Sequence, residues 1–577
     1  MLKRILRRPV PAAASALPDA THPVLRRIYA ARGVGSAREL DFGLAQMHSY
    51  TALTGIDAAT TLLCAHLAAQ SRIMVIADFD ADGATSCATL VRGLRLMGAR
   101  DVEYLVPNRF TYGYGLTPEI VDVAARREPA LLITVDNGIS SIDGVAEAKR
   151  RGMQVLITDH HLPGAVLPAA DAIVNPNQPG DDFPSKNLAG VGVVFYLLSA
   201  LRARLREERW FAQQGVAEPS LAPLLDLVAL GTVADVVPLD HLNRILVAQG
   251  VARINHGRAS AGVAAMLEVA GRDPARVVAA DLGFAVGPRL NAAGRLDDMS
   301  LGINCLLTDD RVTAVAMAQR LDALNRERRE IEDRMKAQAF ASIDEQLRDT
   351  GDVMAPALCL FDPEWHQGVI GIVAGRVKDR MHRPVIAFAP AGDGLLKGSA
   401  RSVAGLHIRD VLDDVASANP GLLTKFGGHA MAAGLSLPEE NLPQFTACFE
   451  AAVRRRVTDE TLQNVVYSDG ELSETELSLP FASLLRQAGP WGQGFPEPIF
   501  DGAFNVLERR TVGERHVKYK LKPLLGRVPV EAIAFNVRDG EVAQPAQQIQ
   551  LAFKLDVNEY RGQQSPQLVV EHWLPKN

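Results

Sequence analysis

The sequence predicts an α/β protein: a parallel-sheet domain, a long connecting helix, a second α/β domain and a C-terminal β-barrel. The first sheet is predicted by three continuously apolar runs, IMVIAD, LLITVDNG and QVLITDHH, which helical patterns separate. Strands buried on both faces of a parallel sheet have this pattern. The barrel is predicted by alternating apolar and polar residues joined by turns after about residue 465.

Length and composition limit the classes of protein that fit. The chain has 577 residues, which at roughly 150 residues per domain predicts three or four domains. Its net charge of −6 argues against a general polyanion binder but allows a local basic surface. The five cysteines form no CxxC pair, and the sequence has no secretory signal and no apolar run of membrane-spanning length. We therefore expect a cytoplasmic protein that binds no membrane.

Composition changes along the chain place the domain boundaries. Residues 308–348 contain no Gly or Pro and are dense in charge, which predicts one long exposed helix between domains. The Ala/Pro/Arg-rich first 20 or so residues predict a mobile tail. The expected segments are an N-terminal tail and cap, the first α/β domain, the connecting helix, the second α/β domain and the barrel, over 1–55, 56–307, 308–350, 351–460 and 461–577.

Three aspartates at every second position follow the first strand. If the chain stays extended, Asp78, Asp80 and Asp82 lie on one side, where their mutual repulsion calls for a cation. The segment also matches the start of an EF-hand loop, but position twelve is Thr89 instead of Glu, and the preceding residues favour a strand. A solvated acidic turn is a further alternative.

The next two strands also end in polar side chains. Asp136 follows the second run, and Asp159, His160 and His161 follow the third. Ligands bind beyond the carboxyl ends of parallel strands, so these residues are expected to gather at one edge of the sheet. Adjacent histidines diverge from an extended chain, so at most one is expected to bind a given ion. Asp235, in the apolar run LLDLVALGTVADVVPL, is a fourth candidate, with a helix cap or buried turn as the alternative.

The ligand types predict the metal and the reaction. Carboxylates with some imidazole suit Mn²⁺ or Mg²⁺ better than zinc, and the number of carboxylates is enough for two ions. Paired ions of this kind activate water and offset charge on phosphate oxygens in phosphoryl hydrolysis. The sequence has no GxxxxGK[ST] loop, which excludes a P-loop nucleotidase.

Taken in order, these motifs resemble a known family. The segments DFDADG, VDNG, DHH and TVADVVPL resemble the four motifs of the DHH phosphoesterases. HQGVIGIVAGR, KGSARS and GGHAMAAG resemble the DHH-associated domain that follows. WGQGFPEPIF and LDVNEYRGQQSPQL resemble the linker and OB-fold barrel of the family's single-strand-specific 5′→3′ DNA exonucleases. The resemblance covers about residues 70 to 575 and implies an active site in the groove between the two α/β domains.

The resemblance also implies a role for each motif residue. Asp78 and Asp80 would hold the first ion, and Asp136 would bridge both ions. The second ion would be held by Asp82, His160 and Asp235. His161 would contact the scissile phosphate or act as an acid, while Asp159 would orient the histidines.

Residues outside the DHH motifs predict how DNA is held. Arg109 and Tyr114 lie in a Gly-rich loop that suits a phosphate and a stacked base, or else a plain surface loop. By resemblance, Arg109, Ser399 and Arg401 would capture the 5′ phosphate. In GPRLNAAGR, read as a loop entering the groove, Arg289 would neutralise transition-state charge with Arg295, or make a structural salt bridge, and Asn291 would contact DNA. His429 is expected to contact substrate, with a simple turn as the alternative.

The barrel contains a local basic segment. Lys518, Lys520 and Lys522 alternate on one strand, so they face one side, which suits a track for single-stranded DNA. A barrel edge protected by lysines is the alternative.

The favoured function is therefore a metal-dependent 5′→3′ exonuclease on single-stranded DNA that releases 5′ mononucleotides in recombination and repair. Two other functions stay open: a DHH phosphodiesterase for short oligoribonucleotides or cyclic dinucleotides, and a catalytically inactive DNA-binding scaffold. The resemblance further implies a monomer that works with single-strand-binding protein and a RecQ-type helicase.

Overall fold

The computed structural model describes residues 3–11, 17–107, 115–349, 354–458, 460–513, 516–535, 537, 544, 547–560 and 562–575. The chain divides into two compact units. The larger unit comprises Arg8–Asn325 and Asp469–Asn577, and the smaller unit comprises Met1–Arg7 and Arg326–Ser468. The domain boundaries expected from the sequence stay predictions.

The larger unit contains a five-stranded, fully parallel sheet, as the apolar runs predict. In sheet order its strands are β3 (Val102–Leu105), β2 (Ile73–Ala77), β4 (Leu131–Val135), β5 (Gln154–Thr158) and β6 (Ala172–Val174). The order of the strands reverses between β2 and β4. Open α/β sheets bind ligands at the carboxyl ends of the strands where the order reverses, which here are β2 and β4.

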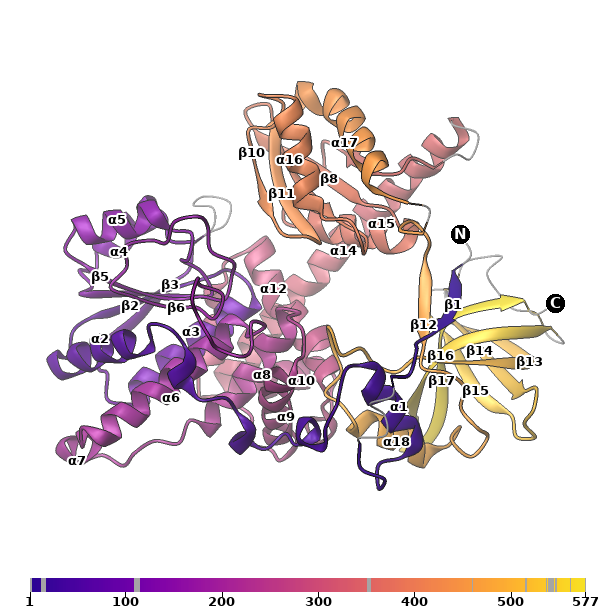
Figure 1. The fold of residues 1–577 in the computed structure, drawn as a ribbon, viewed down its shortest axis with the longest axis horizontal. Coiled ribbons are helices and arrows are strands. Elements are labelled where there is room, and N and C mark those ends of the chain that lie inside the picture. The colour runs from indigo at the N-terminus through magenta and orange to yellow at the C-terminus, as the bar shows by residue number, and fades with distance from the viewer. Residues whose placement is uncertain are drawn as a thin grey trace. The chain divides into compact units, whose positions relative to one another are not determined.

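Helices cover both faces of this sheet (Figure 1). One face packs against α4 (Pro118–Ala125) and α5 (Ile142–Arg150), and the other against α2 (Ile56–Ala69), α3 (Ala81–Leu96) and α6 (Gly190–Glu207). Because both faces are buried, the strands must be apolar throughout, and every residue of β2 and β4 is buried.

Further helices complete the larger unit. They are α1 (Pro23–Ala31), η2 (Ala37–Leu40), η3 (Leu44–Gln46), η4 (Tyr50–Ala52), α7 (Trp210–Gln214), η5 (Ala222–Leu224), α8 (Leu225–Ala234), α9 (His241–Asn255), α10 (Ala261–Val269), η6 (Pro274–Arg276), α11 (Ala279–Asp281), the π-helical turn η7 (Leu282–Val286), α12 (Gly287–Leu296) and α13 (Ser300–Leu307). The segment GPRLNAAGR is thus helix α12, and its interpretation as a loop is wrong.

The predicted long helix is α14 (Arg311–Asp349), with 39 residues. Its first part belongs to the larger unit and the rest, from Arg326, to the smaller unit. Most of its described residues are exposed, as predicted, but α14 also buries an apolar stripe in the core of each unit. The buried residues are Ala314, Ala318 and Leu321 in the larger unit and Met335, Ala339 and Ile343 in the smaller one.

The smaller unit is built on a second, mixed sheet. In sheet order its strands are β10 (Lys425–Gly428), β11 (Ala432–Pro438), β9 (Leu395–Arg401), β8 (Val385–Gly392) and β7 (Leu358–Phe361). One face packs against α16 (Ile408–Ala418) and α17 (Leu442–Arg456), which follows the short η8 (Glu439–Asn441), and the other packs against α14 and α15 (Ile370–Met381).

The predicted barrel closes in the order β13-β14-β15-β17-β16. Its strands are β13 (Phe500–Val512), β14 (His516–Pro523), β15 (Val530–Ala534), β16 (Gln548–Tyr560) and β17 (Gln563–Pro575). β15 and β17 pair in parallel, and the other neighbours are antiparallel. The helix α18 (Leu479–Gln487) packs on the barrel through Phe481 and Leu485.

The N-terminal residues differ from the expected mobile tail. Arg4–Arg7 form strand β1, which pairs in parallel with β12 (Val465–Ser468). Among the described helices, none is by itself long and apolar enough to cross a membrane, although the bent pair Leu44–Ala52 and Ile56–Ala69 passes the same test by length and composition alone.

Candidate metal centre

The aspartates of DFDADG lie where strand β2 turns into helix α3. Asp80 is the N-cap of α3, and its Oδ1 accepts hydrogen bonds from the backbone N–H groups of Asp82 (2.9 Å) and Gly83 (3.0 Å). A strand precedes the loop, so the EF-hand alternative is wrong. The premise of an extended chain is also wrong, because Asp82 already lies in the first turn of α3.

Asp82 is fully buried and anchored by a second helix. Its Oδ2 accepts a hydrogen bond from the backbone N–H of Gly190 (2.6 Å), and its Oδ1 accepts one from Val191 (3.0 Å). Both donors belong to the N-terminus of α6, whose partial positive charge favours a carboxylate. Among the described residues, backbone donors fix this side chain and no Lys or Arg forms a salt bridge with it.

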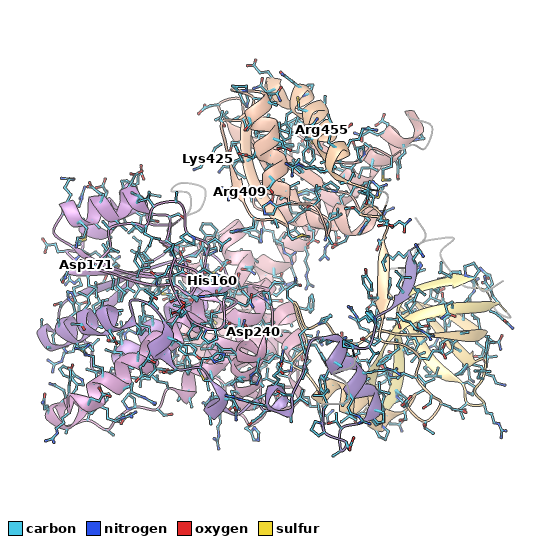
Figure 2. All side chains as sticks on the ribbon, viewed as in Figure 1. His160, Asp171, Asp240, Arg409, Lys425 and Arg455 are labelled. Carbon is cyan, nitrogen blue, oxygen red and sulfur yellow. The ribbon has the colours of Figure 1, made fainter. Side chains whose placement is uncertain are left out.

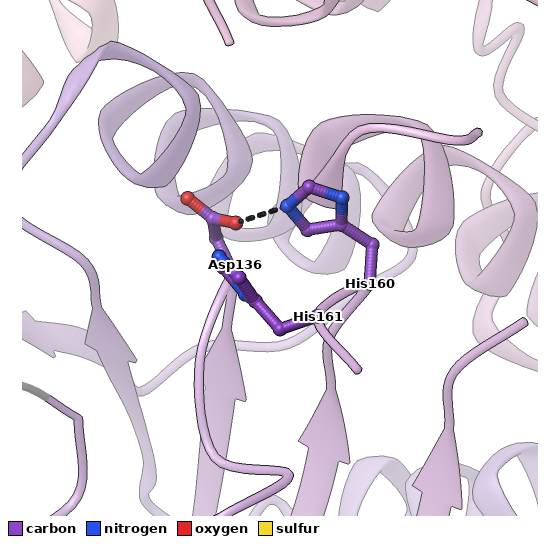
Figure 3. Close-up of side chains that lie close together, drawn as sticks. All are labelled: Asp136, His160 and His161. Carbon is purple, nitrogen blue, oxygen red and sulfur yellow. Dashed lines mark ion pairs between the residues drawn. The ribbon is translucent and has the colours of Figure 1, made fainter. Parts of the chain in front are cut away.

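Asp136 follows strand β4 and is also buried. Its φ of 61° lies in the left-handed region, which Asp and Asn adopt more readily than other non-glycine residues. Its Oδ1 lies 3.1 Å from Nε2 of His160 (Figure 3). This places the second strand end against the third, as the sequence predicts for parallel strands.

Asp159 holds both histidines of the DHH motif. Its Oδ1 accepts hydrogen bonds from the backbone N–H groups of His160 (2.7 Å) and His161 (3.1 Å) and lies 2.7 Å from Nδ1 of His161. Its Oδ2 accepts a hydrogen bond from the N–H of Ile139. Burial alone would raise the pKa of Asp159, but these contacts outweigh it and the pKa is lowered.

The two imidazoles lie closer together than expected for adjacent residues. The ring centroids of His160 and His161 are 4.5 Å apart (Figure 3), so the expectation that they diverge is wrong. Burial opposes the charged form of His161, yet the hydrogen bond to Asp159 and the charge of that carboxylate raise its pKa to about 9. In the metal-free chain this shift favours the protonated form of His161 at neutral pH.

Asp235 completes the set from the end of helix α8. Its Oδ2 lies 3.5 Å from Nε2 of His160, is buried, and accepts no hydrogen bond from any residue that the structure describes. The next residue, Val236, has a φ of 63°, which is strained for a β-branched side chain. Backbone strain of this kind is concentrated at functional sites.

Together these side chains form three overlapping groups whose potential ligand atoms lie within 4.8 Å of one another. The groups are Asp78, Asp80 and Asp136; Asp82, His160 and Asp235; and Asp136, His160 and His161. Figure 2 labels His160, which belongs to two of the groups. The structure thus brings together the eight residues predicted from the DHH motifs, with Asp159 as the hydrogen-bonding support.

Electrostatics shows that the cluster fits a cation. Burial, then the charges of neighbouring aspartates, raises the pKa of Asp82 and of Asp136 well above the ordinary value. Burial and the charge of Asp80 raise the pKa of Asp235 to about 7. Crowded carboxylates with unused oxygen atoms are suited to a hard divalent cation, and the added imidazole suits Mn²⁺ as well as Mg²⁺.

Sequence reasoning missed two supporting residues after strand β6. The side chain of Asn175 donates a hydrogen bond to the carbonyl of His161 (2.9 Å), and that of Asn177 donates to the carbonyl of His160 (2.6 Å). The signal was the segment NPN, which follows a fourth strand at the same edge of the sheet. These amides fix the backbone that carries both imidazoles.

Two residues predicted to bind phosphate meet in the smaller unit. Nη1 of Arg401 donates to Oγ of Ser399 (3.1 Å), and both side chains lie beside Gly371 in the first turn of α15. A Cβ on Gly371 would lie 2.9 Å from each of them. We call this group of three residues the α15 pocket. Burial lowers the pKa of Arg401, because the guanidinium loses contact with water. An anion bound beside it would replace this lost solvation.

The remaining predicted residues have varied surroundings. Arg289 is nearly buried and pairs with Asp322 (2.8 Å), which matches the structural salt-bridge alternative. The side chain of Asn291 accepts a hydrogen bond from the N–H of Ala81 (2.9 Å). Arg295 is half-buried on α12, and His429 is exposed between β10 and β11. Arg109 and Tyr114 lie outside the described residues.

The lysines of the barrel face outward, as their alternation predicts. Lys518 and Lys520 are partly exposed on β14, while Val517, Tyr519 and Leu521 between them point into the barrel core. Lys518 lies opposite Arg510, and Lys520 lies opposite Glu508, whose Oε1 is 3.9 Å from its Nζ. The net local charge of this outer face is positive.

Comparison with protein families divides the chain in the same order as its motifs. Residues 72–232 match the N-terminal domain of the DHH family, residues 353–455 match the DHHA1 domain, and residues 468–572 match the RecJ OB domain.

Curated relatives match over nearly the whole chain. The single-stranded-DNA-specific exonuclease RecJ of Dickeya dadantii is 56% identical over 570 residues, which are 98% of each chain. The protein of the same name from Escherichia coli is 52% identical over 564 residues, which are 97% of each chain.

A solved structure has the same fold. The crystal structure of RecJ in complex with Mn²⁺ from Thermus thermophilus superposes with a TM-score of 0.80 at 33% identity, covering 100% of this chain and 79% of that one. On the extent of these matches, this chain belongs to the RecJ family of DHH proteins.

Proposed function

We propose that this chain is a divalent-metal-dependent exonuclease specific for single-stranded DNA, which hydrolyses phosphodiester bonds from the 5′ end and releases 5′ mononucleotides. The observation that carries the proposal is the set of three overlapping carboxylate and imidazole groups at the carboxyl end of the parallel sheet. The relatives that share this whole chain are named as single-stranded-DNA-specific exonucleases, and a structural relative holds Mn²⁺. This function serves DNA recombination and repair.

The side chains divide between two Mn²⁺ or Mg²⁺ ions. Asp78, Asp80 and Asp136 would hold one ion, and Asp82, His160 and Asp235 would hold the other, with Asp136 shared between them. When bound, such ions lower the pKa of water and offset the negative charge that develops on phosphate oxygens.

The protein supplies orientation and a proton beside the ions. The metal-free chain favours the protonated form of His161 at neutral pH, and its imidazolium would donate a hydrogen bond to the scissile phosphate or a proton to the leaving oxygen. Asp159 keeps this imidazole in place through Nδ1, which leaves Nε2 as the donor.

Residues away from the cluster would hold the DNA. The α15 pocket supplies a guanidinium, a hydroxyl and an uncapped helix N-terminus, which together suit the terminal 5′ phosphate. Lys518 and Lys520 would attract the DNA backbone along the barrel. Contacts of Arg109, Tyr114, Arg295 and His429 with DNA belong to the same proposal, as does a charge-neutralising role for Arg289.

The cellular setting follows from this activity. A single-strand nuclease needs its substrate exposed, so we expect single-strand-binding protein and a RecQ-type helicase as partners of the monomeric chain in the cytoplasm. Co-purification of the native chain with each partner from cell extract, with and without nuclease treatment, would test a direct contact.

A degradation assay tests the function itself. Purified protein with Mn²⁺ is given a single-stranded oligonucleotide labelled at its 3′ end, with blunt duplex and RNA as controls. We expect a descending ladder of labelled products on single-stranded DNA alone, and none in EDTA. An intact long strand, with cleavage only of short oligoribonucleotides or cyclic dinucleotides, would instead identify a small-substrate DHH phosphodiesterase.

A further inference from the structure

Helix α12 lies directly against the loop that carries the first metal ligands. Oδ1 of Asn291 accepts a hydrogen bond from the backbone N–H of Ala81 (2.9 Å), although 210 residues separate the two in sequence. Ala81 is the first residue of α3 and sits between Asp80 and Asp82. The contact therefore falls in the middle of the DFDADG motif.

Asn291 and Asp80 share the task of accepting hydrogen bonds from the first N–H groups of α3. The first N–H groups of a helix need acceptors, and three of them in α3 belong to Ala81, Asp82 and Gly83. Asp80 serves Asp82 and Gly83 with a single oxygen, Oδ1, while Asn291 serves Ala81. Asn291 thus satisfies the N–H of Ala81, which an N-cap side chain does not reach, while capping occupies only Oδ1 of Asp80 and leaves Oδ2 available as a metal ligand.

A second contact one turn further along α12 fixes the same loop. A Cβ on Gly294 would lie 1.9 Å from the carbonyl oxygen of Phe79, so only glycine allows the helix to approach this closely. Residues three apart lie on one face of a helix. Asn291 and Gly294 therefore contact the loop on both sides of Asp80, at Ala81 and Phe79.

The start of α12 touches the other ligand-bearing segment. A Cβ on Gly287 would lie 3.2 Å from that of Ala234, the residue before Asp235. The π-helical turn η7 packs beside it, where a Cβ on Gly283 would lie 3.0 Å from Cγ1 of Val233. One helix thus contacts the backbone next to Asp80 and the backbone next to Asp235.

We propose that Asn291 is a positioning residue of the metal centre, which holds Asp80 and its loop in the geometry that binds the ion. The proposal rests on the proposed metal-dependent function and differs from the expectation that Asn291 contacts DNA.

Mn²⁺ binding to the DNA-free protein tests the proposal. The loss of free Mn²⁺ signal in electron paramagnetic resonance gives the affinity of the native chain and of Asn291→Ala. Removing a group that orients a metal ligand commonly weakens metal binding about tenfold to a hundredfold, and we expect a loss in this range. Nuclease activity of Asn291→Ala should return as Mn²⁺ is raised, with little change in KM for DNA.

Two further variants separate positioning from general stability. Asn255 on α9 exchanges two hydrogen bonds with the backbone of Val277, so Asn255→Ala should lower the melting temperature but leave Mn²⁺ affinity unchanged. Asn291→Asp keeps an acceptor for Ala81, and its Mn²⁺ affinity should stay nearer to that of the native chain than to that of Asn291→Ala.

Native Mn²⁺ affinity in Asn291→Ala, combined with a raised KM for single-stranded DNA, would overturn the proposal and identify a DNA contact. Equal weakening of Mn²⁺ binding in Asn255→Ala would overturn it too, because the loss would then reflect stability. If the native chain bound no Mn²⁺, the result would instead contradict both the metal centre and the proposed metal-dependent function.

Discussion

The metal centre and the α15 pocket use helix N-termini in opposite ways. In the metal centre, the N-termini of α3 and α6 are already occupied by the carboxylates of Asp80 and Asp82. In the α15 pocket, no side chain caps the first turn of the helix, and the neighbouring groups are Ser399 and Arg401. A helix N-terminus that is filled by acids leaves a site that needs a cation, whereas one without a side-chain cap, beside a guanidinium, suits an anion.

The two regions also differ in their cost to the fold. The metal centre buries several carboxylates that repel one another, so without a cation it reduces the stability of the native state. The α15 pocket buries one guanidinium that already donates to Ser399 and to the carbonyl of Ala400. Removal of the metal should therefore change the stability of the larger unit much more than the absence of a bound phosphate changes the stability of the smaller unit.

The largest effect is expected at Asp136. Asn tolerates the positive φ of this residue, so Asp136→Asn should fold normally while losing the charge shared between the two ions. A loss of several kcal/mol of charge stabilisation corresponds to a fall in single-turnover rate of about a thousandfold. The exposed Asp122→Asn on α4 is the matched control and should keep the native rate. A near-native rate for Asp136→Asn would refute the shared-ligand role.

A smaller effect is expected in the α15 pocket. Gly371→Ala places a methyl group 2.9 Å from Arg401 and Ser399, which displaces them and narrows the space for a phosphate. Misplacement on this scale can cost up to about a hundredfold, and the loss should be confined to substrates with a 5′ phosphate. The comparison of 5′-phosphorylated and 5′-hydroxyl oligonucleotides measures it.

Gly375→Ala, one turn along the same helix, is its control. A Cβ there meets nothing within 4 Å, so this variant should be indistinguishable from the native chain. If Gly371→Ala and Gly375→Ala lose activity equally on the 5′-phosphorylated and 5′-hydroxyl oligonucleotides, the α15 pocket does not bind the terminal phosphate.

The pH dependence of metal binding sharpens the comparison further. The pKa of Asp235 is raised from 3.8 to about 7, so below pH 7 a proton competes with the metal. Mn²⁺ affinity should fall about tenfold per pH unit below 7 for one displaced proton, as titration calorimetry would measure. A pH-independent affinity between pH 6 and 8 would contradict this role of Asp235.

The same shift predicts the stability of the metal-free chain. Between about pH 4 and pH 7 the native state keeps a proton on Asp235 that the unfolded state has lost. The free energy of unfolding should therefore fall as pH rises through this window and level off above it. Asp235→Asn should make this slope smaller, as denaturant titrations in EDTA would show.

The smallest effect is expected on the barrel. Lys518→Ala removes one exposed cation from the face of β14, so binding to single-stranded DNA should weaken only a few-fold. The slope of log affinity against log salt should become shallower by about 0.7, independent of DNA sequence. Leu525→Ala, at a fully exposed apolar side chain on the turn after β14, should change neither quantity. If the slope of log affinity against log salt were unchanged in Lys518→Ala, the DNA would not contact this face of β14.

Three residues of the metal centre could be predicted from sequence because each follows a strand directly. Asp78, Asp136 and Asp159 come directly after continuous apolar runs, and parallel pairing brings the ends of those runs together. Short-range pattern and one rule of sheet topology were therefore sufficient to predict that these three residues lie close together. The outward lysines of β14 followed in the same way from the period of a strand.

The supporting contact of Asn291 could not be predicted, because its partner is distant in the chain. Asn291 holds Ala81 across 210 residues, and nothing in the local pattern of either segment indicates the other. The glycines of GPRLNAAGR favour a loop by propensity, but Gly294 is required for close packing against Phe79, and the segment is a helix. Tertiary packing overrode local preference at this helix and at the buried stripe of α14.

An anomalous diffraction map at the manganese edge, from crystals grown with Mn²⁺, tests the metal centre most directly. We expect two peaks about 3.5–4 Å apart at the carboxyl ends of β2 and β4. One should be ligated by Asp78, Asp80 and Asp136, and the other by Asp82, His160 and Asp235. Manganese bound elsewhere, or absent from these six side chains at saturating concentration, would contradict the metal-dependent function.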